Sequence, residues 1–156
     1  MTRVKKALPL LAAPLALAAC STLGLPNGDV TGSISGTAPA GGDVRLALLG
    51  RTGGGFENNA VDQVDVGTFN PQKRVYAISL PAAPRAGAYE VTAYVDSNGN
   101  KAYDAGEPRT TYQNRFLIYS NSDLGLFGFN VKQGWNRVEG SAVSQGRPFS
   151  GFDLRW

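Results

Sequence analysis

The sequence of 156 residues contains no histidine and only one cysteine, Cys20. Without histidine the chain lacks the usual general base at neutral pH, the usual zinc ligand and any Ser-His-Asp or Cys-His catalytic arrangement. A single cysteine also permits no disulfide within the chain. These absences exclude the commonest catalytic constellations, and we therefore expect a protein that is not an enzyme.

Apolar runs long enough to cross a bilayer as a helix are lacking as well. The apolar run at residues 7–19 falls short of the roughly 20 residues that a spanning helix needs. It follows the basic residues Arg3, Lys5 and Lys6, and this order is typical of a cleaved export signal. We expect residues 1–19 to be a signal peptide that takes no part in the fold.

The apolar run ends in Leu17, Ala18, Ala19 and Cys20. This tetrapeptide resembles the lipobox of bacterial lipoproteins. The resemblance implies that Cys20 becomes the first residue, carries acyl chains such as palmitate, and anchors the protein to a membrane of the cell envelope. Because Ser21 is not an aspartate, the resemblance implies the outer membrane in a cell with two membranes, and otherwise the outer face of the cell membrane. The alternative is an ordinary secretory signal that contains a cysteine.

The formal net charge of +3 belongs to the signal. Of the fifteen Lys and Arg residues three lie in residues 1–19, which leaves twelve against twelve Asp and Glu. A neutral domain offers no electrostatic reason to expect nucleic acid as a partner. The expected partners are the membrane, through lipidated Cys20, and an envelope protein or a glycan.

Residues 20–29 form a polar tether, and residues 30–156 are expected to form one domain. Short segments with the alternation of half-buried strands follow one another, separated by Gly, Pro and Asn turns. No segment of this domain shows helical periodicity over three turns. The pattern predicts an all-β fold, a single antiparallel β-sandwich of seven to eight strands. The expected strands lie within residues 30–36, 43–49, 62–66 (a short edge strand), 73–80, 89–95, 110–119, 124–131, 135–142 and 150–156.

The clearest of these strands is 89–95. Its alternation places Tyr89 and Val91 on a buried face, together with Ala93 and Val95, whereas Glu90 and Thr92 are expected to face solvent. The strand runs directly into an oxygen-rich stretch, DSNGNKAYDAGE, at residues 96–107.

We call residues 96–107 the 96–107 loop and interpret it as a calcium site. Calcium prefers six to eight oxygen ligands in a flexible shell. Oxygen-bearing side chains fall at the first, third, fifth, ninth and twelfth positions, and a main-chain carbonyl is expected at the seventh. The alternative is a plain hairpin turn built on Asn98 and Gly99. The candidate ligands are Asp96, Asn98, Asn100, Asp104, Glu107 and the carbonyl of Ala102.

The 96–107 loop resembles the loop of an EF-hand, with Gly99 at the fourth position and Tyr103 at the eighth. It departs at the sixth position, where the usual glycine is Lys101. The stretch is also similar to the calcium loops of B-type repeats in Gram-positive surface adhesins. Residues 84–89 look like the beginning of a strand in transthyretin-like (prealbumin-like) bacterial sandwich domains. Together these resemblances imply one calcium ion that stiffens a β-sandwich.

Three carboxylates leave the expected site at a charge of minus one when calcium is bound, and Lys101 opposes the ion. We therefore expect one weakly bound Ca²⁺, with a dissociation constant on the order of 0.1–1 mM, as in extracellular modules. The first functional hypothesis is a calcium-stiffened structural or interaction module.

Two other functions stay open at this point. Aromatic residues are numerous in the second half, and exposed aromatic rings stack on sugars. A surface carbohydrate-binding module would use Tyr94 and Tyr119, which are expected to be exposed. A lipid-anchored hydrolase would instead need a carboxylate dyad. The acid pairs available for one are Asp62 with Asp65, and Glu139 with Asp153.

Overall fold

The computed structural model describes residues 28–53, 56–57, 64–68, 74–111, 114–126 and 129–156. Within these residues there is no helix, and the strands build two main sheets with mostly antiparallel pairing. The predicted all-β sandwich is confirmed. Nowhere in this part of the chain is there a helix long and apolar enough to pass through a membrane.

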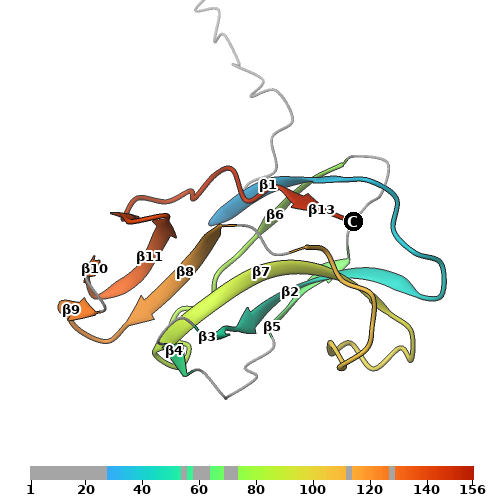
Figure 1. Cartoon of the computed structure of the whole chain (residues 1–156), viewed down its shortest axis with the longest axis horizontal. Coiled ribbons are helices and arrows are strands. Elements are labelled where there is room, and N and C mark those ends of the chain that lie inside the picture. Colours follow the sequence, from blue (N-terminus) through green and yellow to red (C-terminus); the bar gives the residue numbers. More distant parts are fainter. Residues whose placement is uncertain (1–27, 54–55, 58–63, 69–73, 112–113, 127–128) are drawn as a thin grey trace, which may run out of the picture.

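The larger sheet has six strands, and every neighbouring pair in it is antiparallel. The long strand β7 lies inside this sheet and pairs with β2 along eight residues (Figure 1). From one edge to the other the strands are β12 (Ala142–Ser144), β11 (Gly134–Glu139), β8 (Arg115–Ser120), β7 (Gly87–Asp96), β2 (Asp43–Gly50) and β5 (Val64–Thr68).

The smaller sheet packs against the larger one and has three strands. Its central strand pairs antiparallel with β6 and parallel with β13, so the last strand of the chain lies beside the first. Two short ribbons complete the described structure. The strands of the smaller sheet are β13 (Leu154–Arg155), β1 (Val30–Ser35) and β6 (Val75–Ile78), and the ribbons are β3 (Thr52–Gly53) with β4 (Phe56–Glu57) and β9 (Leu124–Leu126) with β10 (Phe129–Val131).

The main hydrophobic core lies between the two sheets and contains buried side chains from β1, β2, β6, β7, β8 and β11. Tyr89 and Trp135 meet edge to face at 5.3 Å between ring centroids. The hydroxyl of Tyr89 donates to the carbonyl of Arg85 at 2.6 Å, and the indole of Trp135 donates to the carbonyl of Pro81 at 2.9 Å. These two bonds attach the loop before β7 to the core.

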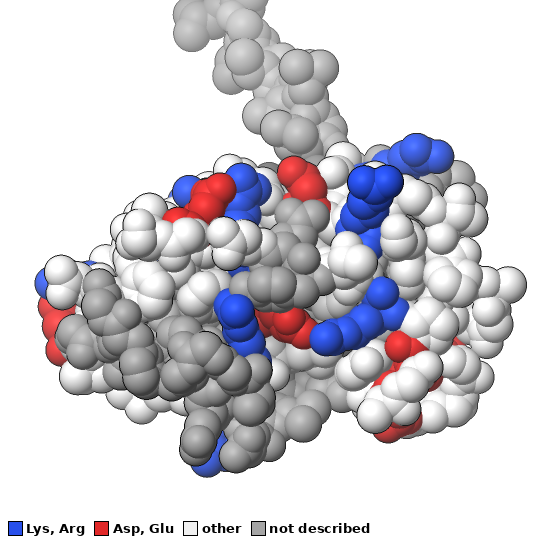
Figure 2. Space-filling view, in the orientation of Figure 1, with Lys and Arg blue, Asp and Glu red and all other residues white. Residues whose placement is uncertain are grey.

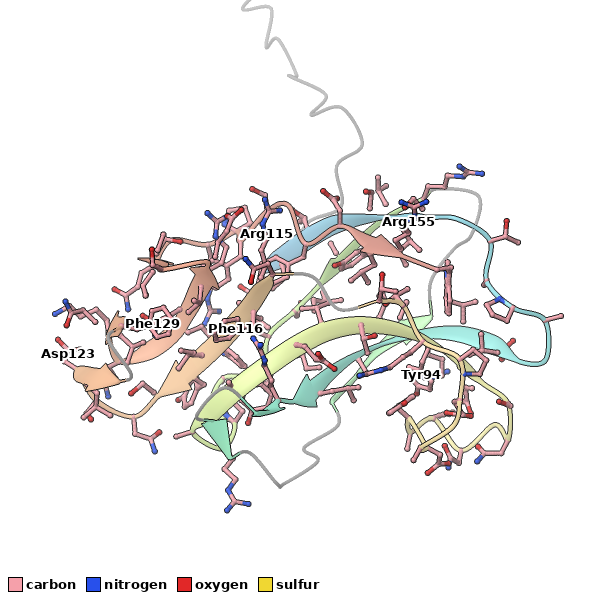
Figure 3. The ribbon with its side chains drawn as sticks, in the orientation of Figure 1. Tyr94, Arg115, Phe116, Asp123, Phe129 and Arg155 are labelled. Carbon is pink, nitrogen blue, oxygen red and sulfur yellow. The ribbon has the colours of Figure 1, made fainter. Side chains whose placement is uncertain are left out.

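The outer face of the six-stranded sheet is also covered. At one end, Phe116 of β8 packs edge to face against Phe129 of β10. At the other end, Tyr94 of β7 packs edge to face against Tyr103 of the 96–107 loop, with ring centroids 5.8 Å apart. Figure 3 shows the two clusters toward opposite ends of the sheet.

The prediction that Thr92 faces solvent is therefore wrong. Only 3% of Thr92 is exposed, and Glu90 on the same face is half-buried. The chain after the 96–107 loop folds back over this part of β7, and the hydroxyl of Thr92 lies 3.1 Å from that of Thr110. Alternation within one strand could not reveal this cover, because the covering residues come from the next segment.

Each of the nine predicted segments overlaps a strand, but the ribbon β3–β4 was not predicted and residues 135–142 run from β11 into the separate strand β12. Residues 124–131 form the hairpin β9–β10 and not one strand, because the chain reverses between Leu126 and Phe129. The two main sheets hold six and three strands, one more than the upper end of the predicted range. The edge strand expected within 62–66 is confirmed as β5, at the edge of the larger sheet.

Val91→Asp and Thr92→Asp are both expected to lower the free energy of unfolding by several kcal/mol, because each places a carboxylate in a buried position. Urea unfolding followed by circular dichroism measures the effect. Ser144→Asp, at an exposed position of the edge strand β12, is the control and should change stability by no more than about 0.5 kcal/mol. A Thr92→Asp variant as stable as the control would contradict the burial of the outer face.

Candidate functional site

The 96–107 loop is closed at its base by strand pairing on both sides. Asp96 ends β7 and lies opposite Asp43 of β2. After the loop, the carbonyl of Pro108 accepts from the backbone of Val95 at 2.9 Å, and the backbone of Thr110 donates to Ala93 at 2.8 Å. The chain thus leaves and rejoins the same sheet, and the ends of the loop are held together as in a hairpin (Figure 1).

Gly42 also shapes the base of the loop. A Cβ at this position would collide with the carbonyl oxygen of Asp96 and lie within 3.0 Å of the Cα of Ser97. Only glycine lets the chain before β2 approach the start of the loop so closely.

Inside the loop, three predicted ligands accept hydrogen bonds from the backbone a few residues ahead. Asp96 Oδ2 accepts from the N–H of Lys101 at 3.0 Å. Asn98 Oδ1 accepts from Asn100 at 3.0 Å, and Asn100 Oδ1 accepts from Ala102 at 2.7 Å. Such Asx turns bend the backbone around the side-chain oxygens. The first half of the loop is therefore wound toward its own oxygen atoms.

The second half of the loop supplies the other two carboxylates. Asp104 Oδ2 accepts from the side-chain amides of Asn98 and Asn100 at 2.8 and 2.7 Å. Glu107 Oε1 accepts from the backbone of Ser97 at 2.7 Å, and its Oε2 accepts from the backbone of Asp104 at 3.0 Å. The structure thus connects Asn98, Asn100, Asp104 and Glu107 through one hydrogen-bond network, whereas Asp96 bonds separately to the backbone of Lys101.

The sixth position of the loop, Lys101, has a left-handed backbone conformation, which is costly for any residue other than glycine. Lys101 has φ of 64°, in the left-handed region. A residue with a Cβ loses roughly 1–2 kcal/mol there, which explains why glycine is usual at this position. Ala102 follows, half-buried, with its N–H bonded to Asn100 and its carbonyl as the predicted seventh-position ligand.

Asp96 is the most buried of the predicted ligands. Only 4% of it is exposed, and its Oδ1 is buried with no hydrogen-bond partner among the described residues. Arg45 of β2, itself 7% exposed, places its Nε 4.0 Å from Oδ2 of Asp96. A buried carboxylate oxygen without a partner is costly, and a cation beside it would remove that cost.

Sequence reasoning did not identify Arg45 as part of the site. The signal was present, because Arg45 interrupts an otherwise apolar strand that runs from Val44 to Leu49. A buried arginine calls for a negative partner, and the β2–β7 register supplies Asp96.

Carboxylates alone do not make the site. Among the residues with described side chains, no three of His, Cys, Asp or Glu gather closely enough to hold a metal ion. A cation in the 96–107 loop would therefore depend on the amide oxygens of Asn98 and Asn100 and on main-chain carbonyls. An all-oxygen donor set of this kind suits a hard cation such as calcium and is unsuited to softer metals. Figure 2 shows acidic side chains at the end of the molecule that carries the loop, with basic side chains beside them.

The aromatic residues do not form an exposed platform in the described part of the chain. The expectation that Tyr94 is exposed is wrong, because Tyr103 covers it and none of its surface is accessible. Tyr119 is half-buried, and its ring packs edge to face on Trp135 at 5.3 Å. Its hydroxyl is directed to the carbonyl of Ala82 at 3.4 Å. These contacts give both tyrosines a role in packing.

The carboxylates proposed for a hydrolytic dyad have structural partners. Glu139 pairs with Arg115 at 2.6 Å, and this hydrogen bond holds the pKa of Glu139 below its usual range. Asp153 accepts from the backbone and the hydroxyl of Ser33 at 2.9 and 2.7 Å. A general acid needs a raised pKa, so Glu139 is unsuited to that role. Asp62 lies outside the described residues, and the side chain of Asp65 is not described.

The lipobox residues Leu17 and Cys20 lie outside the described residues, as does the tether up to residue 27. The lipid anchor therefore stays a prediction from the sequence. Comparison of the chain with models of protein families, with curated proteins and with solved structures gave no match.

Lys101→Gly is expected to raise the free energy of unfolding in the absence of divalent ions by about 0.5–1 kcal/mol. The variant relieves the left-handed strain, and the extra entropy of glycine in the unfolded chain offsets part of the gain. Thermal unfolding with a chelator present measures it. Ala102→Gly, one residue later at a position without positive φ, is the control and should be destabilising. A destabilised Lys101→Gly variant would contradict the strained conformation.

Proposed function

We propose that this chain is a non-enzymatic lipoprotein of the cell envelope, a β-sandwich that one calcium ion stiffens and that acts as a structural or interaction module. The observation that supports it best is the buried carboxylate of Asp96 at the start of a closed, oxygen-rich loop, because no residue in the described part of the chain bonds to its Oδ1. The two halves of the proposal, calcium and the lipid anchor, are independent and have separate tests.

The hydrogen-bond network of the 96–107 loop is compatible with calcium. A side-chain carbonyl has two lone pairs, so Oδ1 of Asn98 and Oδ1 of Asn100 can each keep the backbone bond and also bind a cation. Asp104 and Glu107 already approach the rest of the loop from its far end. Calcium would offset two of the three carboxylate charges, and the loop residues need little rearrangement of the backbone to supply its ligands.

Weak binding follows from the charges around the site. Lys101 lies within the loop, and Arg45 already compensates part of the charge of Asp96. Both cations oppose a second positive charge, which supports a dissociation constant toward the weak end of about 0.1–1 mM. Such a site fills outside the cell, where calcium reaches about the millimolar range that these extracellular modules use.

The loop can transmit its order to the sheet through two contacts. Tyr103 packs on Tyr94 of β7, and Arg109, directly after the loop, pairs with Glu90 on the same strand. An ion that fixes the loop would hold these contacts in place and restrain the outer face of the sheet. This is the physical sense in which calcium stiffens the module.

Calcium at about 2 mM is expected to add roughly 0.6 kcal/mol of stability for a 1 mM site and about 1.8 kcal/mol for a 0.1 mM site. The melting temperature should rise by a few degrees, and chelation should lower it again without unfolding the protein. Magnesium should substitute poorly, because it demands a stricter octahedral shell. Differential scanning calorimetry of the full chain measures the shift.

Asp96→Asn and Glu107→Gln should each abolish the calcium-dependent shift, because each removes a ligand charge. Asp123→Asn is the matched control, since Asp123 is an exposed acid that pairs with Lys132 at 2.8 Å outside the loop. It should keep the shift. If 10 mM calcium leaves the melting temperature of the wild-type protein unchanged, the 96–107 loop is an ordinary acidic turn.

Cys20→Ala is expected to move the protein from the membrane fraction to the soluble fraction. The lipobox resemblance implies two or three acyl chains on Cys20, and each buried methylene contributes roughly 0.8 kcal/mol to membrane binding. Fractionation of cells, with mass spectrometry of the mature N-terminus, measures both location and modification. A wild-type protein that is soluble and carries an unmodified Cys20 would contradict the proposed lipid anchor.

A further inference from the structure

A cleft of about 400 Å³ opens at one end of the sandwich, between the ends of the two sheets. Its volume lies within the range of small-molecule sites in proteins. The walls come from the end of β1, the turn that follows it, the start of β2, the residue before β6 and the residue after β13. The residues that carry the argument are Ile34, Gly36, Thr37, Val44, Arg74 and Trp156.

The walls of this cleft are mainly apolar and continue the main core. Ile34 is buried in that core, and Val44 and Trp156 pack against it while partly open to solvent. Gly36 has φ of 84°, and a Cβ there would lie 3.3 Å from the Cβ of Trp156. The glycine therefore allows the turn to pass close to the tryptophan, which forms one wall of the cleft.

None of the described side chains that line the cleft is acidic. Arg74 is exposed, and no described residue makes a hydrogen bond or an ion pair with its guanidinium. Its backbone is fixed, because its carbonyl accepts from the N–H of Ile34 at 2.9 Å. Thr37 adds a hydroxyl. An unpaired guanidinium beside apolar walls suits an anion with an apolar body.

Arg74 also has φ of 51°, in the left-handed region. Residues other than glycine avoid this region, and where they occupy it they are found disproportionately at ligand sites. Among the described residues nine glycines have positive φ, yet the chain has arginine here. The strain and the unpaired charge are independent observations, and both concern the same residue.

We propose that this cleft binds a small carboxylate with an apolar body, which lies against Trp156, Ile34 and Val44 while its carboxylate pairs with Arg74. A neutral sugar fits less well, because its hydroxyls need acceptors as well as donors and the described lining contains no carboxylate or amide side chain. A phosphate dianion fits less well too, because Arg74 is the only cation among the described residues that line the cleft. The proposal does not depend on calcium or on the lipid anchor.

The test uses the full chain in a nonionic detergent with two carboxylates, octanoate and 3-phenylpropionate, and the primary alcohol of each. Binding is followed by NMR shifts of the indole N–H of Trp156 and by calorimetry. Both acids should bind at least tenfold more tightly than their alcohols. The difference in affinity between octanoate and 3-phenylpropionate then shows whether an aliphatic or an aromatic body fits better.

Arg74→Gln should lower the affinity for the acids at least tenfold and leave the affinity for the alcohols unchanged. Arg74→Lys should restore part of it. Arg85→Gln is the matched control, because Arg85 is exposed and lies outside the lining of the cleft. Arg74→Gly can adopt the same left-handed backbone conformation and should also bind the acids more weakly. This variant therefore separates loss of the cation from misfolding.

Four results would overturn the proposal. Acids and alcohols that bind equally would show a merely apolar cleft without anion recognition. Equal affinities of Arg74→Gln and Arg85→Gln would show that Arg74 does not hold the carboxylate. No binding of either acid up to 10 mM, or stronger binding of maltose than of the acids, would assign the cleft to no ligand or to a carbohydrate.

Discussion

Strand β7 is the constraint on which the rest of the structure depends. β2 pairs with it along one edge for eight residues, whereas the other edge is shared by β8 and by the segment that follows the 96–107 loop. Tyr89 and Val91 place one face in the main core, and Thr92 and Tyr94 place the other face beneath the returning chain. A strand buried on both faces and paired on both edges is rigid, and the 96–107 loop starts at its last residue.

The attachment of the 96–107 loop to the end of β7 explains why the loop is ordered by its own hydrogen bonds. The hairpin base brings Asp96 and Glu107 together, so the short polar side chains between them can reach backbone N–H groups across the turn. Arg45 compensates part of the buried charge of Asp96 from the neighbouring strand. A cation would therefore add to a loop that is already wound, and its contribution would be an increment of stability and not a condition for folding.

Several features of the fold could be predicted from local sequence. The alternation in 89–95 located β7, and the spacing of oxygens located a loop whose predicted side-chain ligands do contact one another. The burial of Thr92 and Tyr94 could not be predicted in the same way, because Thr110 covers Thr92 from beyond the loop and Tyr103 covers Tyr94 from within it. The role of Arg45 could not be predicted for a related reason. Its partner Asp96 lies fifty-one positions away and meets it only through the β2–β7 register.

The sequence by itself determined features that depend on neighbours in the chain: the all-β class, the position of most strands, the oxygen-rich loop and the left-handed cost of Lys101. These follow from side-chain alternation and from short-range hydrogen bonding, which act over a few residues. Tertiary structure alone decided which faces are covered, that β13 pairs parallel with β1, and that Arg74 and Trp156 line the same cleft. Those contacts join residues far apart in the chain, and only the packing of the two sheets brings them together.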